Sequence, residues 1–403
     1  MKRILLSVFA AAITAAWVVP ASAADVTLSG QYRLRGEYRN NVDFTDNTSD
    51  SRAAWTQRVR LTTNAKATDD TSVKVTLQDT RTWGQNGSGA LLTDASSTNN
   101  TVDLHEAFLN INNVLGTPVT LKVGRQELAY GDERIIGSFG WSNNGRAFDA
   151  AKIVYGTDAV NVDVFLATVD EDSVDTDATL NDDTVLNGVY ATLKQVVPNN
   201  TVDLYLIHQS NGTALTRYTL GARVKGSAAG LDYTLELPYQ FGEESDTVDI
   251  SAYAFAAKVG YNLPTPTKIR VGAEFDYGSG DDGTDATSND NWTDLFPTNH
   301  AHFGYADVSG ANSWSNLMAF SVNATAALNE KTSLYAAYWN FTKNEVASGA
   351  DDSVGSEIDV TATYKYNNAV TAEIGGSYFI PGDGLAVDGD NQSWGYLMLT
   401  ANF

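Results

Sequence analysis

The first long alternating run of the chain begins at residue 25, where apolar and small residues occupy every second position. Val26, Leu28, Tyr32 and Leu34 share one parity, and polar or charged residues share the other. A period of two places successive side chains on opposite faces, which is the pattern of a β-strand with one apolar face. The run continues to residue 39 and is longer than the usual strand of a globular protein. It predicts a strand that crosses a thick apolar layer.

The same period recurs along the whole chain and predicts eighteen strands without any convincing helix. The predicted strands are 25–39, 52–66, 72–83, 102–111, 119–126, 147–155, 160–169, 185–195, 202–209, 215–225, 231–240, 250–261, 267–277, 314–326, 332–341, 357–366, 370–380 and 393–403. In the run 267–277 we expect Val271 and Phe275 on the outward face and Glu274 and Asp276 on the inward face. Aromatic residues near strand ends predict girdles at the two membrane interfaces, formed by Tyr253, Tyr261, Tyr335, Trp339, Tyr364 and Tyr366.

The connections between these runs alternate in length. Short ones such as 67–70 and 328–331 take turns with longer, mostly acidic ones such as 241–249 and 278–313. This rhythm predicts an all-β fold, a transmembrane antiparallel β-barrel of about 18 strands with both termini periplasmic. Closure is required because every backbone N–H and C=O must be paired internally in lipid. A soluble β-sandwich or β-solenoid is the alternative for long alternation, but the terminal Phe403 resembles the C-terminal signal of outer-membrane barrels.

The N-terminal segment has the features of an export signal. Lys2 and Arg3 precede an apolar stretch from Ile4 to Val19, and Ala21-Ser22-Ala23 forms a small-residue cleavage site. We predict a signal peptide at 1–23 and an outer-membrane β-barrel at 24–403, in a Gram-negative-type bacterium. No later stretch approaches the ~18 apolar residues of a membrane helix. The chain has no Cys, which excludes disulfides and Cys-based metal sites.

Charge is sorted between loops and strands. The formal net charge of −23 argues against binding of nucleic acid through a basic face. Acidic residues crowd the long connections, whereas basic residues of the strands share the inward parity. These inward residues are Arg33, Arg35, Arg39, Arg58, Arg60, Lys122, Arg217, Arg223, Lys225, Lys268 and Arg270. They either form salt bridges with wall acids such as Glu37 and Glu274, or they form a cationic track that eases the passage of anions.

The stretch from Gly124 to Ala150, GRQELAYGDERIIGSFGWSNNGRAFDA, is an unusual connection. Most loops are short, but this one sets Tyr130, Phe139 and Trp141 beside paired charges. We predict that residues 127–146 fold back into the lumen, where three arginines set a positive constriction that three acids partly neutralise. The arginines are Arg125, Arg134 and Arg146, and the acids are Asp132, Glu133 and Asp149. A long surface loop with a few salt bridges is the alternative.

Two segments carry a family resemblance. The stretch 124–150 resembles the signature of the alginate export family of outer-membrane β-barrel porins, and LFPTNHAHFGYADV (295–308) resembles the second signature of that family. The resemblance implies an eighteen-stranded barrel with an arginine-lined, anion-selective constriction that inward loops partly close. It also implies that the arginines and acids of the first segment, named above, belong to this lining.

These observations lead to a passive porin for anionic solutes or an acidic polysaccharide. Its expected partners are that solute, outer-membrane lipid and lipopolysaccharide, and the outer-membrane barrel assembly machinery. A plugged structural or adhesive barrel stays open as a second class. A barrel enzyme is the third class, and it would need a nucleophile supported by His and an acid.

No catalytic residue, metal site or cofactor is predicted. His300 and His302 flank Ala301 and are weak candidates for metal ligands, because a third ligand at a typical spacing is missing. Packing within the loop is the expected role of both. The run from Asp281 to Asp285 resembles a fragment of a calcium-binding loop without its full ligand set, so loop-bound Ca²⁺ is a weak expectation.

Overall fold

The structure is a computed structural model that describes residues 25–45, 50–84, 102–170, 183–194, 197–211, 214–386 and 389–403. The predicted signal peptide, 1–23, lies outside the described residues. Within them the chain is largely strand, with two short 3-10 helices, η1 (Val114–Gly116) and η2 (Asn299–Ala301). Among the described residues no helix is long and apolar enough to cross a membrane.

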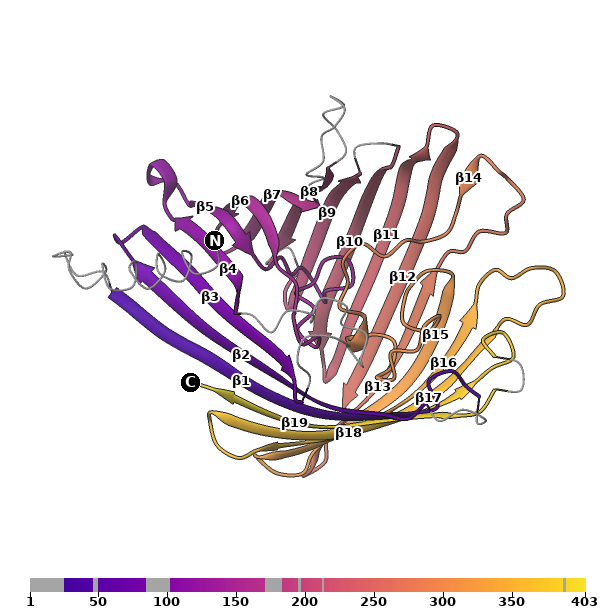
Figure 1. Ribbon diagram of the computed structural model, residues 1–403. Coiled ribbons are helices and arrows are strands. Elements are labelled where there is room, and N and C mark those ends of the chain that lie inside the picture. The colour runs from indigo at the N-terminus through magenta and orange to yellow at the C-terminus, as the bar shows by residue number, and fades with distance from the viewer. Residues whose placement is uncertain are drawn as a thin grey trace.

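Eighteen long strands form one closed antiparallel barrel, which confirms the predicted fold (Figure 1). Each long strand pairs with its neighbours in sequence, and β1 also pairs with β19. The strands are β1 (Asp25–Asn40), β2 (Arg52–Lys66), β3 (Thr71–Thr82), β4 (Asp103–Ile111), β5 (Val119–Gln126), β6 (Phe148–Gly156), β7 (Val160–Asp170), β8 (Thr184–Leu193), β9 (Asn200–Ser210), β10 (Thr216–Ala228), β11 (Leu231–Ser245), β12 (Val248–Asn262), β13 (Lys268–Gly278), the two-residue β14 (Ser288–Asn289), β15 (Leu317–Ala327), β16 (Thr332–Lys343), β17 (Ser353–Lys365), β18 (Val370–Pro381) and β19 (Gln392–Asn402).

The barrel closes between its first and last strands. Leu34 of β1 lies opposite Leu399 of β19. Near the C-terminus, Phe403 exchanges two backbone hydrogen bonds with Gly30, at N···O distances of 2.7 and 3.0 Å. The start of β1 and the C-terminus therefore lie at the same rim. Short connections such as 229–230 lie at this turn rim, and the connections at the opposite loop rim are mostly longer.

Side chains along the strands follow the predicted parity. In β13, Val271 and Phe275 are exposed on the outward face, whereas Glu274 and Asp276 are buried on the lumen side. This alternation is what a barrel wall between lipid and a polar interior requires.

The predicted aromatic girdle needs a correction in β16. Trp339 is only 4 % exposed and packs in the lumen, and Tyr335 has the same parity. Tyr338, which lies between Tyr335 and Trp339 in the sequence, faces outward and is exposed instead. Aromatic residues occur on both faces of β16, so residue type does not show which ring faces lipid. Only the alternation of side chains along the strand does.

One predicted loop is also wrong. β11 runs to Ser245 and β12 starts at Val248, so the connection is 246–247 and not the acidic loop 241–249. The ladder continues through a register shift near Glu243. Above the apolar band both faces of a strand are polar, so hydrophobic periodicity no longer marks the strand.

Two long connections fold into the barrel rather than away from it. Inner loop 1 (127–147) and most of inner loop 2 (279–316) lie within the ring of strands in Figure 1. The part of inner loop 2 around β14 stays at the loop rim, where β14 pairs with the start of β12. A parallel bridge joins Ile136 to Phe296, with the Gly137 N–H donating to the Phe296 carbonyl oxygen at 2.8 Å. Apolar side chains of both loops, including Trp292, are fully buried. The predicted inward folding of residues 127–146 is thereby confirmed.

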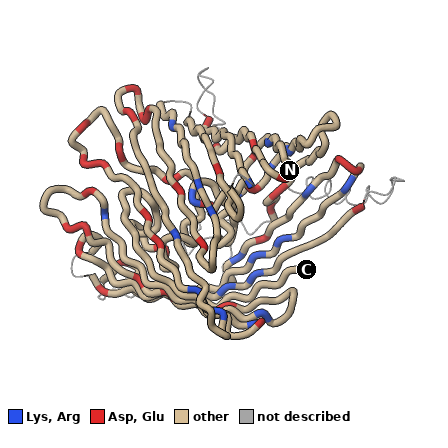
Figure 2. The backbone as a smooth tube through the Cα atoms, turned by 180° about the vertical axis from the view of Figure 1, so that it is seen from behind, with Lys and Arg blue, Asp and Glu red and all other residues tan. Residues whose placement is uncertain are grey.

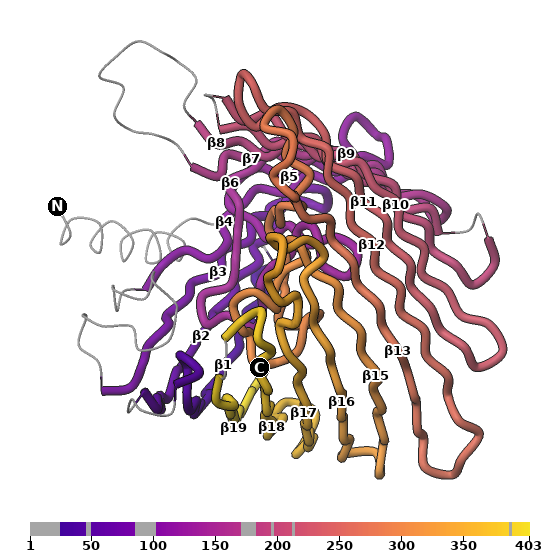
Figure 3. The backbone as a smooth tube through the Cα atoms, turned by 90° about the vertical axis from the view of Figure 1, so that its right-hand side faces the viewer, coloured from indigo at the N-terminus to yellow at the C-terminus, as the bar shows by residue number. Residues whose placement is uncertain are grey.

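Inner loop 2 leaves the wall without opening it. β13 pairs directly with β15 across the whole excursion, with Lys268 opposite Ala327 and Gly278 opposite Leu317. Figure 3 shows β12, β13, β15 and β16 side by side along one wall. The two loops therefore occupy part of the lumen of an unbroken barrel.

Leu34→Arg is expected to hinder barrel assembly, because an arginine facing lipid at the midplane costs about 2–4 kcal/mol. Leu34 points away from the lumen, between the inward residues Arg33 and Arg35. The assembled fraction is measured by heat-modifiable gel migration. Arg33→Leu, on the inward face, is the matched control and is expected to assemble. Equal assembly of the two variants would mean that the parity of β1 is inverted.

Candidate functional site

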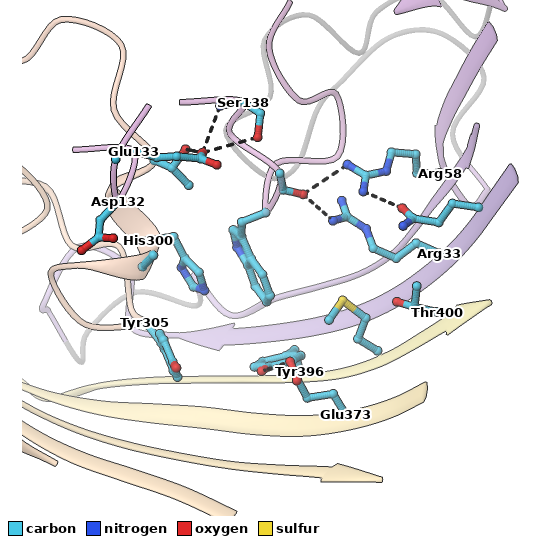
Figure 4. Close-up of a pocket in the computed structure, with 17 residues that line it drawn as sticks. Arg33, Arg58, Asp132, Glu133, Ser138, His300, Tyr305, Glu373, Tyr396 and Thr400 are labelled. Carbon is cyan, nitrogen blue, oxygen red and sulfur yellow. Dashed lines mark hydrogen bonds between the residues drawn. The ribbon is translucent and has the colours of Figure 1, made fainter. Parts of the chain in front are cut away.

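Arginines of β1 and β2 hold the tip of inner loop 1 (Figure 4). Arg33 donates from Nη1 to the Gly140 carbonyl oxygen and from Nη2 to the Ser142 carbonyl oxygen, both at 2.8 Å. Arg58 Nη1 reaches the same two carbonyl oxygens at 3.2 and 3.0 Å. A planar guanidinium suits two acceptors at once. These two predicted pore arginines therefore position the loop that narrows the lumen.

Two further predicted arginines extend this clamp. Arg35 donates from Nη1 to the Trp141 carbonyl oxygen at 2.7 Å, and its Nε lies 2.9 Å from a carboxylate oxygen of Glu37. Arg60 Nη1 lies 3.2 Å from Oε1 of Glu127 in inner loop 1. Arg35 and Arg60 are paired with acids, as the salt-bridge interpretation of the inward arginines predicts. Arg33 and Arg58 are bound by neutral oxygens.

Arg134 anchors inner loop 1 to the wall at β13. Its guanidinium contacts Glu274, and its Nη1 lies 2.9 Å from Oδ1 of Asp276. The Arg134 side chain is only 2 % exposed, and Lys258 of β12 lies 2.9 Å from the same Glu274. The two carboxylates neutralise the buried guanidinium, so Arg134 fixes inner loop 1 to the wall and offers no free charge to a solute.

Asp132 connects inner loop 1 to another wall. Its carboxylate pairs with Arg223 of β10, which also lies 2.8 Å from Asp203. The Asp132 carbonyl oxygen accepts from Nε2 of His302 at 2.7 Å. Burial, with help from nearby cations such as Arg134, lowers the pKa of His302 well below its usual value. A neutral His302 with the proton on Nε2 fits this geometry.

Arg146 and Glu133 join the two inner loops. Arg146 Nη1 donates to the carbonyl oxygens of Phe296 and of Pro297, the latter at 3.1 Å. Burial lowers the pKa of Arg146 to about 10, so it keeps its charge at neutral pH. Glu133 accepts from the Thr298 hydroxyl at 2.6 Å. These two predicted site residues lie together at the junction of the loops.

Arg125 and Asp149 do not line the lumen, which corrects their predicted place. They pair with each other at 3.0 Å, with side chains 43 % and 62 % exposed. Arg125 shares its parity with the exposed Val123, and Asp149 shares its parity with Ile153, so both face outward. Lys122 and Lys152 have the inward parity of these two strands, so Arg125 and Asp149, which have the opposite parity, cannot face the lumen.

Arg270 lies on the inward face of β13, near the turn rim. It pairs with Asp232 of β11, with Nη2 2.6 Å from Oδ1 and Nε 2.9 Å from Oδ2. This two-pronged pair is typical of arginine with a carboxylate. Figure 2 shows that Lys and Arg positions gather on the strands beside the C-terminus, whereas Asp and Glu positions mark many of the long loops.

Two cavities lie along the wall formed by β1 and β19. The turn-side cavity has a volume of about 660 Å³ and is bordered by Arg33, Arg58 and Glu133. The loop-side cavity has a volume of about 560 Å³ and is bordered by Arg39 and Arg52. β1 runs from the turn rim to the loop rim, so Arg33 precedes Arg39 along the barrel axis. The candidate site is this pair of cavities with the loop tip between them.

Some lining residues escaped the sequence analysis. Glu373, Tyr396 and Met398 border the turn-side cavity. Glu357 of β17 accepts the backbone N–H groups of Tyr305 and Ala306, both at 2.7 Å, and so fixes inner loop 2. Inward parity on β17, β18 and β19 was the available signal. Acids and tyrosines are common on a barrel wall, so their residue types alone did not mark Glu357, Glu373 and Tyr396 as lining residues.

The two candidate metal-binding histidines serve different contacts. His300 Nδ1 lies 2.8 Å from a carboxylate oxygen of Asp307, while His302 faces Asp132 and Lys258. Asp281 and Asp285 accept backbone N–H groups of their own turn. Among the described residues no group of three or more His, Cys, Asp or Glu could hold a metal ion.

Solved structures of outer-membrane proteins from Pseudomonas aeruginosa share this fold. OpdO matches with 12 % identity and a TM-score of 0.67, over 94 % of this chain and 97 % of that chain. The outer membrane protein OprD matches with 11 % identity and a TM-score of 0.66, over 95 % of each chain. OccK9 (OpdG) matches with 12 % identity and a TM-score of 0.66, over 94 % and 98 %. At such identities the likeness concerns the fold.

The family is shown by sequence. No curated protein matches the chain, but the family model described as alginate export matches residues 25–395. The match covers nearly all of the chain after the predicted signal peptide. Family and fold together indicate a channel rather than an enzyme and locate the protein in the outer membrane of a Gram-negative bacterium. The protein is an outer-membrane β-barrel channel that belongs to the alginate export family.

Proposed function

We propose that this channel passes small anionic solutes by passive diffusion along the wall formed by β1, β2 and β19. The path runs through the loop-side and turn-side cavities, which arginines border on one side. Neither catalysis nor a resident cofactor belongs to this proposal. Lipopolysaccharide around the loop rim and the barrel assembly machinery are its proposed partners.

The observation that carries the proposal is the kind of acceptor that the arginines bind. Arg33 and Arg58 donate to backbone carbonyl and side-chain amide oxygens, and no carboxylate among the described residues lies within 4 Å of either. A neutral oxygen satisfies the hydrogen bond but leaves the positive charge in place. Fixed charges at the wall of a narrow, low-dielectric passage attract counter-ions of the opposite sign.

Acids border the same turn-side cavity on its other side. Glu373 accepts from the Tyr396 hydroxyl at 2.6 Å, and Glu133 accepts from Thr298; no cation among the described residues lies within 4 Å of these carboxylates. The passage thus has a basic face and an acidic face. An anion follows the arginine face, so the proposed preference is one of degree rather than strict exclusion of cations.

The proposal is tested by the reversal potential of the purified channel in planar bilayers under an asymmetric KCl gradient. We expect the reversal potential to lie between zero and the equilibrium potential of chloride, which means a preference for anions. This preference should weaken with salt, because charges are screened over ~10 Å at 0.1 M. A potential on the potassium side would overturn the anion preference and leave the channel. Absence of any conductance would favour the plugged, adhesive barrel.

An acidic polysaccharide is the second candidate, favoured by the family match over residues 25–395. A polyanion would use the same arginines as weak sites in series. The two candidates are separated by adding uronic acid oligomers of increasing length to the bilayer. If the transient block of the ion current deepens with oligomer length, whichever side of the bilayer the oligomers are added to, the path admits a polymer. If only short oligomers enter the channel, the path is one for small solutes.

A further inference from the structure

Planar side chains form a stacked row inside the lumen. The Arg35 guanidinium carbon lies 4.2 Å from the ring centroid of Trp141, and the Trp141 and His300 rings stack at 3.9 Å with 9° between their planes. His300 in turn stacks on Tyr305 at 5.1 Å, and Tyr305 lies 5.8 Å from Tyr335. We name these five residues the stacked bar. It runs from β1 through both inner loops to β16.

Hydrogen bonds outside the rings hold the stacked bar. Arg35 donates to the backbone of Trp141, and His300 Nδ1 lies 2.8 Å from Asp307. The backbone of Tyr305 donates to Glu357 of β17 at 2.7 Å. The edge of the Trp141 ring also meets Tyr396 of β19 at 5.1 Å between centroids. The bar therefore lies over β17, β18 and β19, the strands between β1 and β16.

Trp141 belongs to the lining of both cavities. The turn-side cavity is bordered by Arg33 and by Met398, and the loop-side cavity by Arg39 and Trp394; Trp141 borders both. On β1 residue numbers rise toward the loop rim, and on β19 they fall, so the two strands order the cavities in the same way. Trp141 sits at the level where one cavity ends and the other begins.

We propose that Trp141 determines the largest solute that passes, as the septum between two halves of one path. This inference deepens the proposed function and rests on it. Both faces of the indole are covered, by Arg35 and by His300, so the ring has no free face on which a solute could stack. Its effect on a solute is therefore steric. Passage of anything larger than a small ion requires this ring to move or to be absent.

The side chain of Trp141 can be removed without releasing the loop. The clamp holds backbone carbonyl oxygens of Gly140, Trp141 and Ser142, which any residue at 141 retains. Arg134 pins the same loop at β13. Trp141→Ala is therefore expected to leave the barrel and inner loop 1 in place. It joins the two cavities.

The test compares wild type, Trp141→Phe and Trp141→Ala in planar bilayers and in liposome swelling with neutral sugars of graded size. We expect single-channel conductance to rise about twofold or more in Trp141→Ala, because the constriction limits the current. The sugar size limit should rise in parallel, with Trp141→Phe between the two. The control Trp55→Ala removes an outward-facing ring of the barrel wall and should change neither quantity.

A second measurement compares a single variant before and after chemical modification, so it does not depend on different variants folding alike. The natural chain has no Cys, so Trp141→Cys carries a single thiol. Alkylation of that thiol with a bulky aromatic reagent is expected to return conductance and size limit toward wild type, and a methylating reagent is not. Unchanged conductance and size limit in all three variants, while wild type conducts, would overturn the septum and leave the proposed function. Silence of wild type and of every variant would overturn both. Conductance in Trp141→Ala alone would support the septum but overturn the proposed function, since wild type would then be a closed barrel.

Discussion

Replacement of Arg134 by leucine is expected to lower the free energy of unfolding of the barrel by about 3–5 kcal/mol. The guanidinium lies against Glu274 and Asp276, and all three side chains are buried. Without it, two carboxylates stay in a low-dielectric interior with only Lys258 close to one of them. Urea-induced unfolding in detergent or lipid vesicles, followed by tryptophan fluorescence, measures the loss.

The matched control for this prediction is Arg125→Leu. Arg125 also pairs with an acid, but both partners are exposed, and such pairs contribute about 0–1 kcal/mol. Adding Glu274→Gln and Asp276→Asn to Arg134→Leu should recover much of the stability, since neutral amides remove both buried carboxylates and leave only the partly exposed Lys258 without its acid. A similar loss in Arg134→Leu and Arg125→Leu would show that burial does not distinguish the two pairs.

Arg33→Gln combined with Arg58→Gln is expected to shift the reversal potential strongly toward the potassium side. Two unit charges about 8 Å from an ion in water contribute about 1 kcal/mol, which is roughly fivefold in its local concentration. Loss of four hydrogen bonds to Gly140 and Ser142 should also loosen the tip of inner loop 1. Current noise should rise together with the change in selectivity.

Arg125→Gln is again the informative control, because it removes one positive charge from the outward face. It should leave the reversal potential near that of wild type. Selectivity that stays unchanged in the Arg33 and Arg58 double variant would show that other groups set the preference. Equal shifts in the double variant and in Arg125→Gln would show that total charge, and not the charge on the lumen wall, is what the ions sense.

The sequence predicted most of the wall correctly because a strand has a strict local period. Arg33, Arg58 and Glu274 are buried on the lumen side, while Leu220 and Phe275 are exposed on the outward face. The same rule would have kept Arg125 and Asp149 out of the predicted lining. Each is an odd step from an inward lysine of its own strand, Lys122 or Lys152. Arg125 and Asp149 were assigned to the lining because they belong to the motif, although their parity places them on the outward face.

The contacts that inward side chains make across the lumen could not be predicted from local sequence patterns. Arg33 meets a carbonyl oxygen 107 residues away, and Arg134 meets a carboxylate 140 residues away. An inward arginine finds either a carboxylate or a backbone oxygen, and the residue type is the same in both cases. Whether its charge stays available to a solute depends on where the loop tip docks.

The sequence by itself determined the closed barrel, its strand number, the direction of most wall side chains and the inward course of residues 127–146. Each of these follows from periodicity, connection length or composition, which act over a few residues. Only the tertiary structure decided that Arg134 fixes inner loop 1 to the wall, that Arg33 and Arg58 hold carbonyl oxygens, and that Trp141 stacks between Arg35 and His300. Such contacts join strands and loops that the chain brings together only when the barrel closes and both loops pack inside it, so no local pattern encodes them.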